Sequence, residues 1–110
     1  MITPAALKII REGMHLPLWW LAEQWGIRET SLKRWEKDRD LPDDLAQKLD
    51  LLQREFFAKV DALIDQEGSD VQIPRNTSPD HYPVEYHRAV AYHALLHRPG
   101  LTITYAEETS

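Results

Sequence analysis

Cysteine is absent from the 110 residues of this chain, and glycine is scarce, with four occurrences. Without cysteine, the fold has no disulfide framework, and no thiol can act as a nucleophile. The composition fits a reducing compartment. No glycine-rich phosphate-binding loop, HExxH motif or nucleophile elbow is present either. We therefore expect no enzyme activity and no cofactor.

Long apolar runs are also missing. No stretch approaches the roughly 20 residues that a membrane-spanning helix needs, and no basic and apolar leader is present at the start. A chain of 110 residues is long enough for one domain with its own core and a small appendage. We expect a cytoplasmic protein that does not enter a membrane.

Charge is distributed unevenly along the chain. The formal net charge is −5 at pH 7, but residues 1–41 carry seven basic and six acidic residues, a net of +1. Residues 42–110 carry six and twelve, a net of −6. Nonspecific affinity for DNA comes mainly from neutralised phosphates, so the chain is expected to bind bulk DNA weakly and to depend on a few placed contacts.

The stretch LWWLAEQWGIRETSLKRWEK, residues 18–37, predicts two short helices joined by a tight turn. Gly26 ends the first helix because the turn requires a positive φ angle. Ala22 is small where the helices cross, and the second helix, residues 29–37, is basic. Apolar residues fill the wedge between the helices: Leu21, Ile27, Leu32 and Trp35. This pattern is typical of a helix-turn-helix, whose second helix enters the DNA major groove; the alternative is an ordinary helical hairpin.

Residues 3–52 resemble the lambda-repressor-like family of phage repressors, Cro proteins and Xre-type regulators. The core positions and the run TSLKRWEKDRDLP after the turn carry this resemblance. It implies a structural ion pair between Arg11 in the first helix and Glu36 in the recognition helix. Two positions depart from the family pattern: Leu18 replaces a frequent glutamine, and Asp38 replaces the glycine that usually follows the recognition helix.

Seven exposed positions form the predicted DNA-binding surface: Arg28, Glu29, Thr30, Lys33, Arg34, Lys37 and Arg39. In the family, positions that match the exposed residues from Glu29 to Arg34 face the groove. Arg34 is expected to form two hydrogen bonds with guanine, whereas Lys37 and Arg39 suit backbone phosphates. The alternative for each residue is a solvated surface charge.

A long helix is predicted from Pro42 to about Gln66. Its apolar stripe is wider than three short helices can cover: Leu45, Leu49, Leu51, Leu52, Phe56, Phe57, Val60, Leu63 and Ile64. The stripe indicates a further packing surface, from the same chain or from a second copy.

Beyond Gly68 the sequence predicts a short strand around residues 71–73, a helix over 82–97 and a strand over 101–105. With the run Pro79-Asp80-His81, this order resembles the small regulators that accompany anti-CRISPR genes in phages and mobile elements. That resemblance implies a dimeric repressor of its own operon. Residues 1–67 would form the DNA-binding domain and residues 68–110 a small dimerisation or packing segment.

Histidines raise the possibility of a metal site. His93 and His97 are four residues apart on the predicted last helix, with His87 nearby, and such a pair can chelate zinc. No Asp, Glu or Cys completes a tetrahedral site at a recognisable spacing. We therefore predict no metal.

The sequence thus predicts a mainly α-helical transcriptional regulator: a lambda-repressor-like helix-turn-helix head with a small α+β C-terminal segment. Two copies related by a twofold axis would meet major grooves about 34 Å apart, so the operator should be an inverted repeat. Three alternatives stay open: an antitoxin whose acidic C-terminal region clasps a toxin, a protein-interaction module that no longer binds DNA, and a zinc-dependent enzyme.

Overall fold

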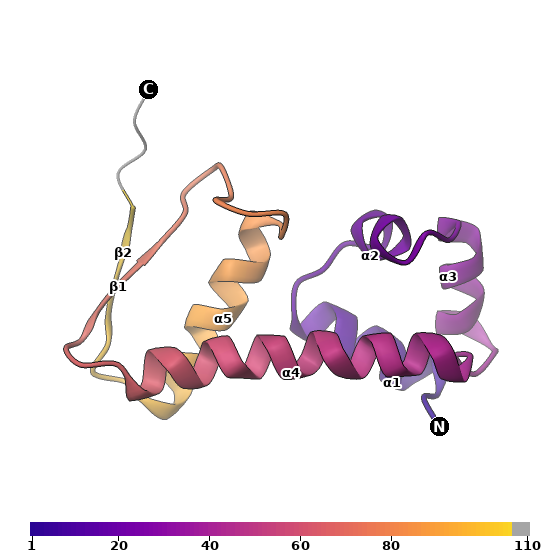
Figure 1. Ribbon diagram of the computed structural model, residues 1–110, viewed down its shortest axis with the longest axis horizontal. Coiled ribbons are helices and arrows are strands. Elements are labelled where there is room, and N and C mark those ends of the chain that lie inside the picture. The colour runs from indigo at the N-terminus through magenta and orange to yellow at the C-terminus, as the bar shows by residue number, and fades with distance from the viewer. Residues whose placement is uncertain (107–110) are drawn as a thin grey trace. The chain divides into compact units, whose positions relative to one another are not determined.

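The computed structural model describes residues 1–106, which hold five α-helices and one two-stranded sheet (Figure 1). The fold is therefore mainly α-helical with a small β component. The chain divides into two compact units, an N-terminal unit of Met1–Arg54 and a C-terminal unit of Glu55–Ser110. Within residues 1–106, no helix has both the length and the apolar character that crossing a membrane requires.

The N-terminal unit contains α1 (Pro4–Gly13), α2 (Leu18–Trp25), α3 (Glu29–Lys37) and the first part of α4 (Asp43–Asp65). Thr3 caps α1, because its hydroxyl accepts a hydrogen bond from the Ala6 amide at 3.2 Å. The apolar residues buried in this unit come from all four helices and their connections: Leu7, Met14, Leu16, Trp20, Leu21, Ala22, Trp25, Leu32, Leu41, Leu45 and Leu49.

The turn between α2 and α3 has the geometry that the sequence predicts at Gly26. This residue ends α2 with a φ of 65°, in the left-handed region. The amide of Ile27 then donates to the carbonyl of Ala22 at 3.0 Å, which closes the end of the helix. After α3, by contrast, Asp38 has a φ of −148°, so α3 ends without a left-handed residue and needs no glycine there.

The C-terminal unit contains the rest of α4, then β1 (Asp70–Ile73), α5 (Val84–His97) and β2 (Thr102–Tyr105). The two strands are parallel, with Val71 opposite Ile103, and α5 lies in the connection between them. Parallel strands need such a crossover because a tight turn cannot join them. The buried apolar residues of this unit come from its helices, β1 and the connecting segments: Phe56, Val60, Val71, Tyr82, Tyr86, Ala89, Val90, Ala91, Ala94 and Leu101.

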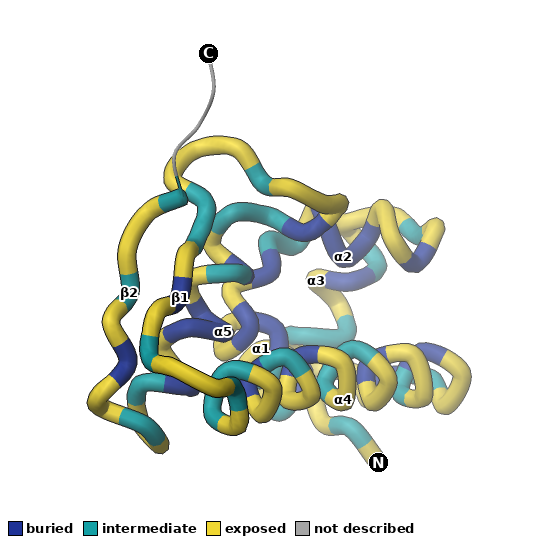
Figure 2. Tube along the Cα trace, turned by 60° about the vertical axis from the view of Figure 1, so that its left-hand side comes forward, coloured by how far each residue is buried: buried dark blue, intermediate teal, exposed yellow. Residues whose placement is uncertain are grey.

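The helix α4 belongs to both units. Buried positions recur along it, with Leu45 and Leu49 in the N-terminal unit and Phe56 and Val60 in the C-terminal unit (Figure 2). The division between these two compact units lies between Arg54 and Glu55, inside the helix. The same chain covers part of the wide apolar stripe, while Leu51 and Phe57 on that stripe remain exposed.

Arg98 closes the C-terminal end of α4. Its guanidinium group donates to four carbonyl groups, those of Leu63 at 3.3 Å, Ile64 at 3.2 Å, Gln66 at 2.9 Å and Gly68 at 2.6 Å. The last carbonyls of a helix have no partner within the helix and carry partial negative charge. Arg98 directly follows α5, so this one side chain provides hydrogen-bond donors for the end of α4 and links it to the end of α5.

Candidate nucleic-acid interface

A buried ion pair joins α3 to α1 within the N-terminal unit. Arg11 on α1 donates from Nε to Glu36 Oε2 at 2.6 Å and from Nη2 to Glu36 Oε1 at 3.0 Å. Its Nη1 also donates to the carbonyl of Leu16, in the loop before α2, at 2.9 Å. Arg11 is only 9% exposed, so these hydrogen bonds compensate for the desolvation of its charge. They join α1, the loop after it and α3.

The inner face of α3 carries its apolar residues. Leu32 is fully buried, and Ser31, Trp35 and Glu36 are half-buried. In the two-helix pair that α2 and α3 form, the helix axes are steeply inclined to each other (Figure 1). The buried residues of α2 that complete this packing are Trp20, Leu21, Ala22 and Trp25. Trp19, next to Trp20, stays 55% exposed.

The outer face of α3 holds the predicted DNA-binding residues. All seven are exposed: Arg28, Glu29, Thr30, Lys33, Arg34, Lys37 and Arg39. Arg28 stands at the N-cap of α3, five of the others lie on the helix, and Arg39 follows it. The five helical positions, 29, 30, 33, 34 and 37, recur with the period of an α-helix. They therefore lie along one side of α3, opposite Leu32.

The cations of this face are not neutralised by the residues that the structure describes. Over residues 1–106, the side chains of Arg28, Lys33, Arg34, Lys37 and Arg39 form no ion pair or hydrogen bond. Glu36, the acidic residue late in α3, is already paired with Arg11. A polyanion that binds this face therefore has no internal ion pair to break.

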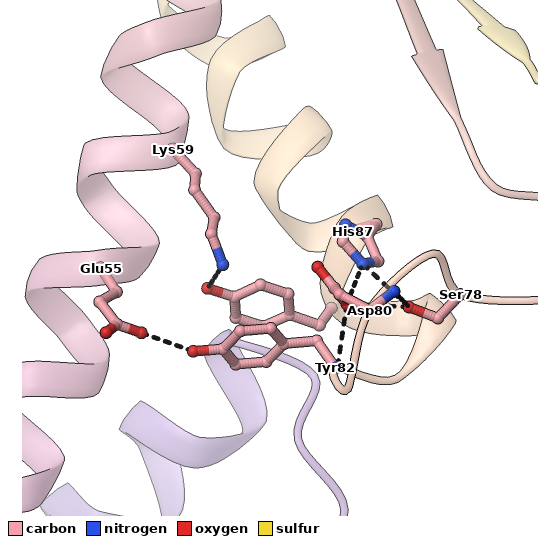
Figure 3. A network of polar contacts seen from close by, with 7 residues as sticks. Glu55, Lys59, Ser78, Asp80, Tyr82 and His87 are labelled. Carbon is pink, nitrogen blue, oxygen red and sulfur yellow. Dashed lines mark hydrogen bonds and ion pairs between the residues drawn. The ribbon is translucent and has the colours of Figure 1, made fainter.

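The C-terminal unit holds a polar cluster that the sequence analysis missed (Figure 3). Nε2 of His87 on α5 lies 3.0 Å from Asp80 Oδ1 and 3.1 Å from Ser78 Oγ. Asp80 Oδ1 also accepts from the amide of Tyr82 at 2.9 Å. Burial by itself raises the pKa of the Asp80 carboxyl, but hydrogen bonds from Tyr82, His87 and Ser78, with the charge of His87, bring it below its ordinary value.

Serine, histidine and aspartate also form the catalytic triad of serine hydrolases, but Ser78, His87 and Asp80 are arranged differently here. In a triad, the carboxylate holds one ring nitrogen of the histidine while the serine uses the other. In this structure, both Ser78 and Asp80 approach the same nitrogen of His87. The arrangement therefore differs from a catalytic triad, and the cluster links the segment before α5 to that helix.

A second network joins α4 to α5 in the same unit (Figure 3). The hydroxyl of Tyr82 donates to Glu55 Oε2 at 2.6 Å, and Lys59 Nζ donates to the hydroxyl of Tyr86 at 3.2 Å. The two tyrosine rings stack with centroids 4.0 Å apart. Burial is the main cause that raises the pKa of Tyr82, and the hydrogen bond with Glu55 raises it further. Burial, together with the charges of Glu55 and Asp80, raises the pKa of Tyr86 to about 12.

His93 on α5 packs against aromatic rings of α4. The ring of His93 lies edge-on to Phe56, with centroids 5.1 Å apart, and 6.2 Å from the ring of Phe57. Among the residues that the structure describes, no group of three or more His, Cys, Asp or Glu side chains is placed to hold a metal ion.

No family model, curated protein or solved structure matches this chain.

Proposed function

We propose that this protein is a sequence-specific DNA-binding regulator whose α2 and α3 act as a helix-turn-helix, with α3 as the recognition helix. The observation that carries the proposal is the exposed side of α3 and its two flanking residues, where five cations without an ion pair among residues 1–106 accompany exposed Glu29 and Thr30. Side chains of this kind on an exposed helix can bind phosphates and base edges.

The ion pair between Arg11 and Glu36 supports the proposal. Reading bases requires a helix held in one orientation, because hydrogen bonds to base edges depend on position and direction. Arg11 links α3 to α1 and to the loop before α2 through three hydrogen bonds. The resemblance of residues 3–52 to lambda-repressor-like regulators implies the same pair.

We further propose that the protein acts as a homodimer, and that its C-terminal unit supplies the contact. Phe57 on α4 and Tyr92 and Leu96 on α5 are 48%, 59% and 58% exposed. The ring of His93 lies 6.2 Å from that of Phe57 and 6.0 Å from that of Tyr92. Leu96 is four residues after Tyr92 and lies on the same side of α5. Exposed apolar groups that cluster in this way mark interaction surfaces. A twofold dimer would repress transcription by occupying an inverted-repeat operator.

The test is DNA binding by the wild type and by Arg34→Ala. Duplexes selected from a random-sequence library, together with DNA from upstream of the protein's own gene, are measured at two salt concentrations. We expect preferred duplexes to outcompete random DNA, with affinity that falls as salt rises. Arg34→Ala should lose about 1–3 kcal/mol of specific binding and relax the preference at one base pair.

Arg54→Ala is the matched control for this experiment. Arg54 is exposed on α4, where it pairs with Asp50 at 2.8 Å, and its removal changes the net charge by the same amount. We expect this variant to bind as the wild type does. Equal losses in the two variants would show that only overall charge matters, and a library selection that enriches no sequence would contradict the proposal.

A further inference from the structure

The C-terminal unit contains a cavity that the proposed DNA-binding function does not use. Its volume is about 310 Å³, and its walls come from α4, β1 and α5 together with the residue after β1. Most of the lining is apolar: Ala62, Leu63, Val71, Ile73, Pro74 and Val90. A cavity of this size lies in the range of small-molecule sites, which are mainly apolar with a few placed polar groups.

Lys59 is a cationic residue among those that line this cavity. Its Nζ lies 3.2 Å from the hydroxyl of Tyr86, 3.9 Å from the ring centroid of Tyr82 and 4.7 Å from that of Tyr86. These contacts orient the ammonium group over two aromatic faces. Within residues 1–106, no carboxylate lies within ion-pair distance of it.

The acidic groups near Lys59 are engaged elsewhere. Glu55, one turn earlier on α4, accepts a hydrogen bond from the hydroxyl of Tyr82 at 2.6 Å. Asp80 pairs with His87, which also lines the cavity and whose Nε2 is occupied by this contact and by Ser78. Lys59 is therefore a half-buried cation beside an apolar cavity, with no ion-pair partner among residues 1–106. A bound anion would stabilise such a partly desolvated charge.

We propose that this cavity binds a small amphipathic carboxylate. The carboxylate group of the ligand pairs with Lys59, and its apolar tail lies against Leu63, Val71 and Val90. This site lies wholly within the C-terminal unit, so the inference stands whether or not α3 binds DNA.

The test compares sodium octanoate with 1-octanol, which has the same chain but no charge. Each is titrated into the full-length protein below its aggregation concentration, and amide chemical shifts are followed by NMR. We expect saturable binding of octanoate at least ten times tighter than that of octanol, with the largest shifts at the residues that line the cavity. Equal affinities, or shifts that do not saturate, would overturn the proposal.

Two lysine variants separate the role of Lys59 from that of charge in general. Lys59→Met keeps the length of the side chain and removes its charge; it should weaken octanoate binding about tenfold and leave octanol binding unchanged. Lys48→Met removes an exposed charge from the part of α4 in the N-terminal unit and should leave both affinities unchanged. Equal effects of the two substitutions on octanoate would contradict the assignment of Lys59. If circular dichroism shows that Lys59→Met does not fold, the comparison of octanoate with octanol in the wild type decides.

Discussion

Arg11 shows how much one residue can determine in the N-terminal unit. It is buried and charged, and its three hydrogen bonds leave the guanidinium matched by one carboxylate and one backbone carbonyl. Removing one partner of a buried ion pair is more destabilising than replacing both, because the remaining charge has lost its water and its counter-ion. The stability of this unit should therefore be sensitive to Glu36.

Glu36→Ala is expected to lower the free energy of unfolding by about 3 kcal/mol, because it leaves the Arg11 charge without its partner. Glu36→Gln should cost less, since its amide oxygen still accepts a hydrogen bond. Urea denaturation followed by tryptophan fluorescence measures both.

Glu12→Ala is the control at this site. Glu12 also lies near Arg11, at 3.8 Å, but its side chain is 55% exposed. Exposed pairs contribute little, so we expect a change of less than about 0.5 kcal/mol. A loss at Glu36 no larger than the loss at Glu12 would show that the buried pair does not stabilise α3.

Among the elements, the turn before α3 depends on backbone conformation. Gly26 has a φ of 65°, whereas Gly13, at the end of α1, has no positive φ. A Cβ atom at either position would meet no atom within 4 Å, so the two sites differ in conformation and not in space.

Gly26→Ala is therefore expected to destabilise the protein by about 1 kcal/mol, because alanine disfavours the left-handed region. Gly13→Ala should be neutral or slightly stabilising, since alanine favours helix. Thermal unfolding of the two variants checks this, and equal melting temperatures would contradict the role given to the turn.

Much of the helical structure could be predicted because its signals are local. The Gly26 stop and the apolar spacing predict α2, α3 and α4 close to their observed bounds. The last helix begins at Val84, later than predicted, because Asp80 holds the amide of Tyr82 and Pro83 is extended.

Contacts between distant elements could not be predicted in the same way. Alternation of residues indicates a strand but not its partner, so the parallel pairing of β1 with β2 was not foreseen. The exposure of the α3 cations followed from spacing, whereas the pair of Arg11 with Glu36 came from a family resemblance. The cavity and the cluster around His87 combine residues from separate elements, and no single segment carries their signal.

For the whole molecule, the exposed apolar residues of the C-terminal unit bear on oligomeric state. Tyr92→Glu places a charge within the proposed dimer contact, and desolvating that charge costs more than the contact returns. We expect the wild type to be a dimer at tens of micromolar by light scattering and Tyr92→Glu to be a monomer.

Ile9→Glu is the matched control for the dimer. Ile9 is 71% exposed on α1, in the N-terminal unit, and receives the same charge. This variant should remain dimeric. A wild type that is monomeric at these concentrations would contradict the dimer, and dissociation by Ile9→Glu alone would place the contact on the other unit.

The parallel pairing of β1 with β2 has a consequence for the order in which the chain acquires structure during synthesis. All residues of the N-terminal unit have been made once Arg54 leaves the ribosome. Phe56 and Val60 then have no core to enter until α5 has been made, and β1 has no partner until β2 follows it. Pairings so distant along the chain form slowly. The nascent protein therefore passes through a stage in which the residues of the N-terminal unit have been made, while the apolar second part of α4 and the unpaired strand β1 still lack α5 and β2.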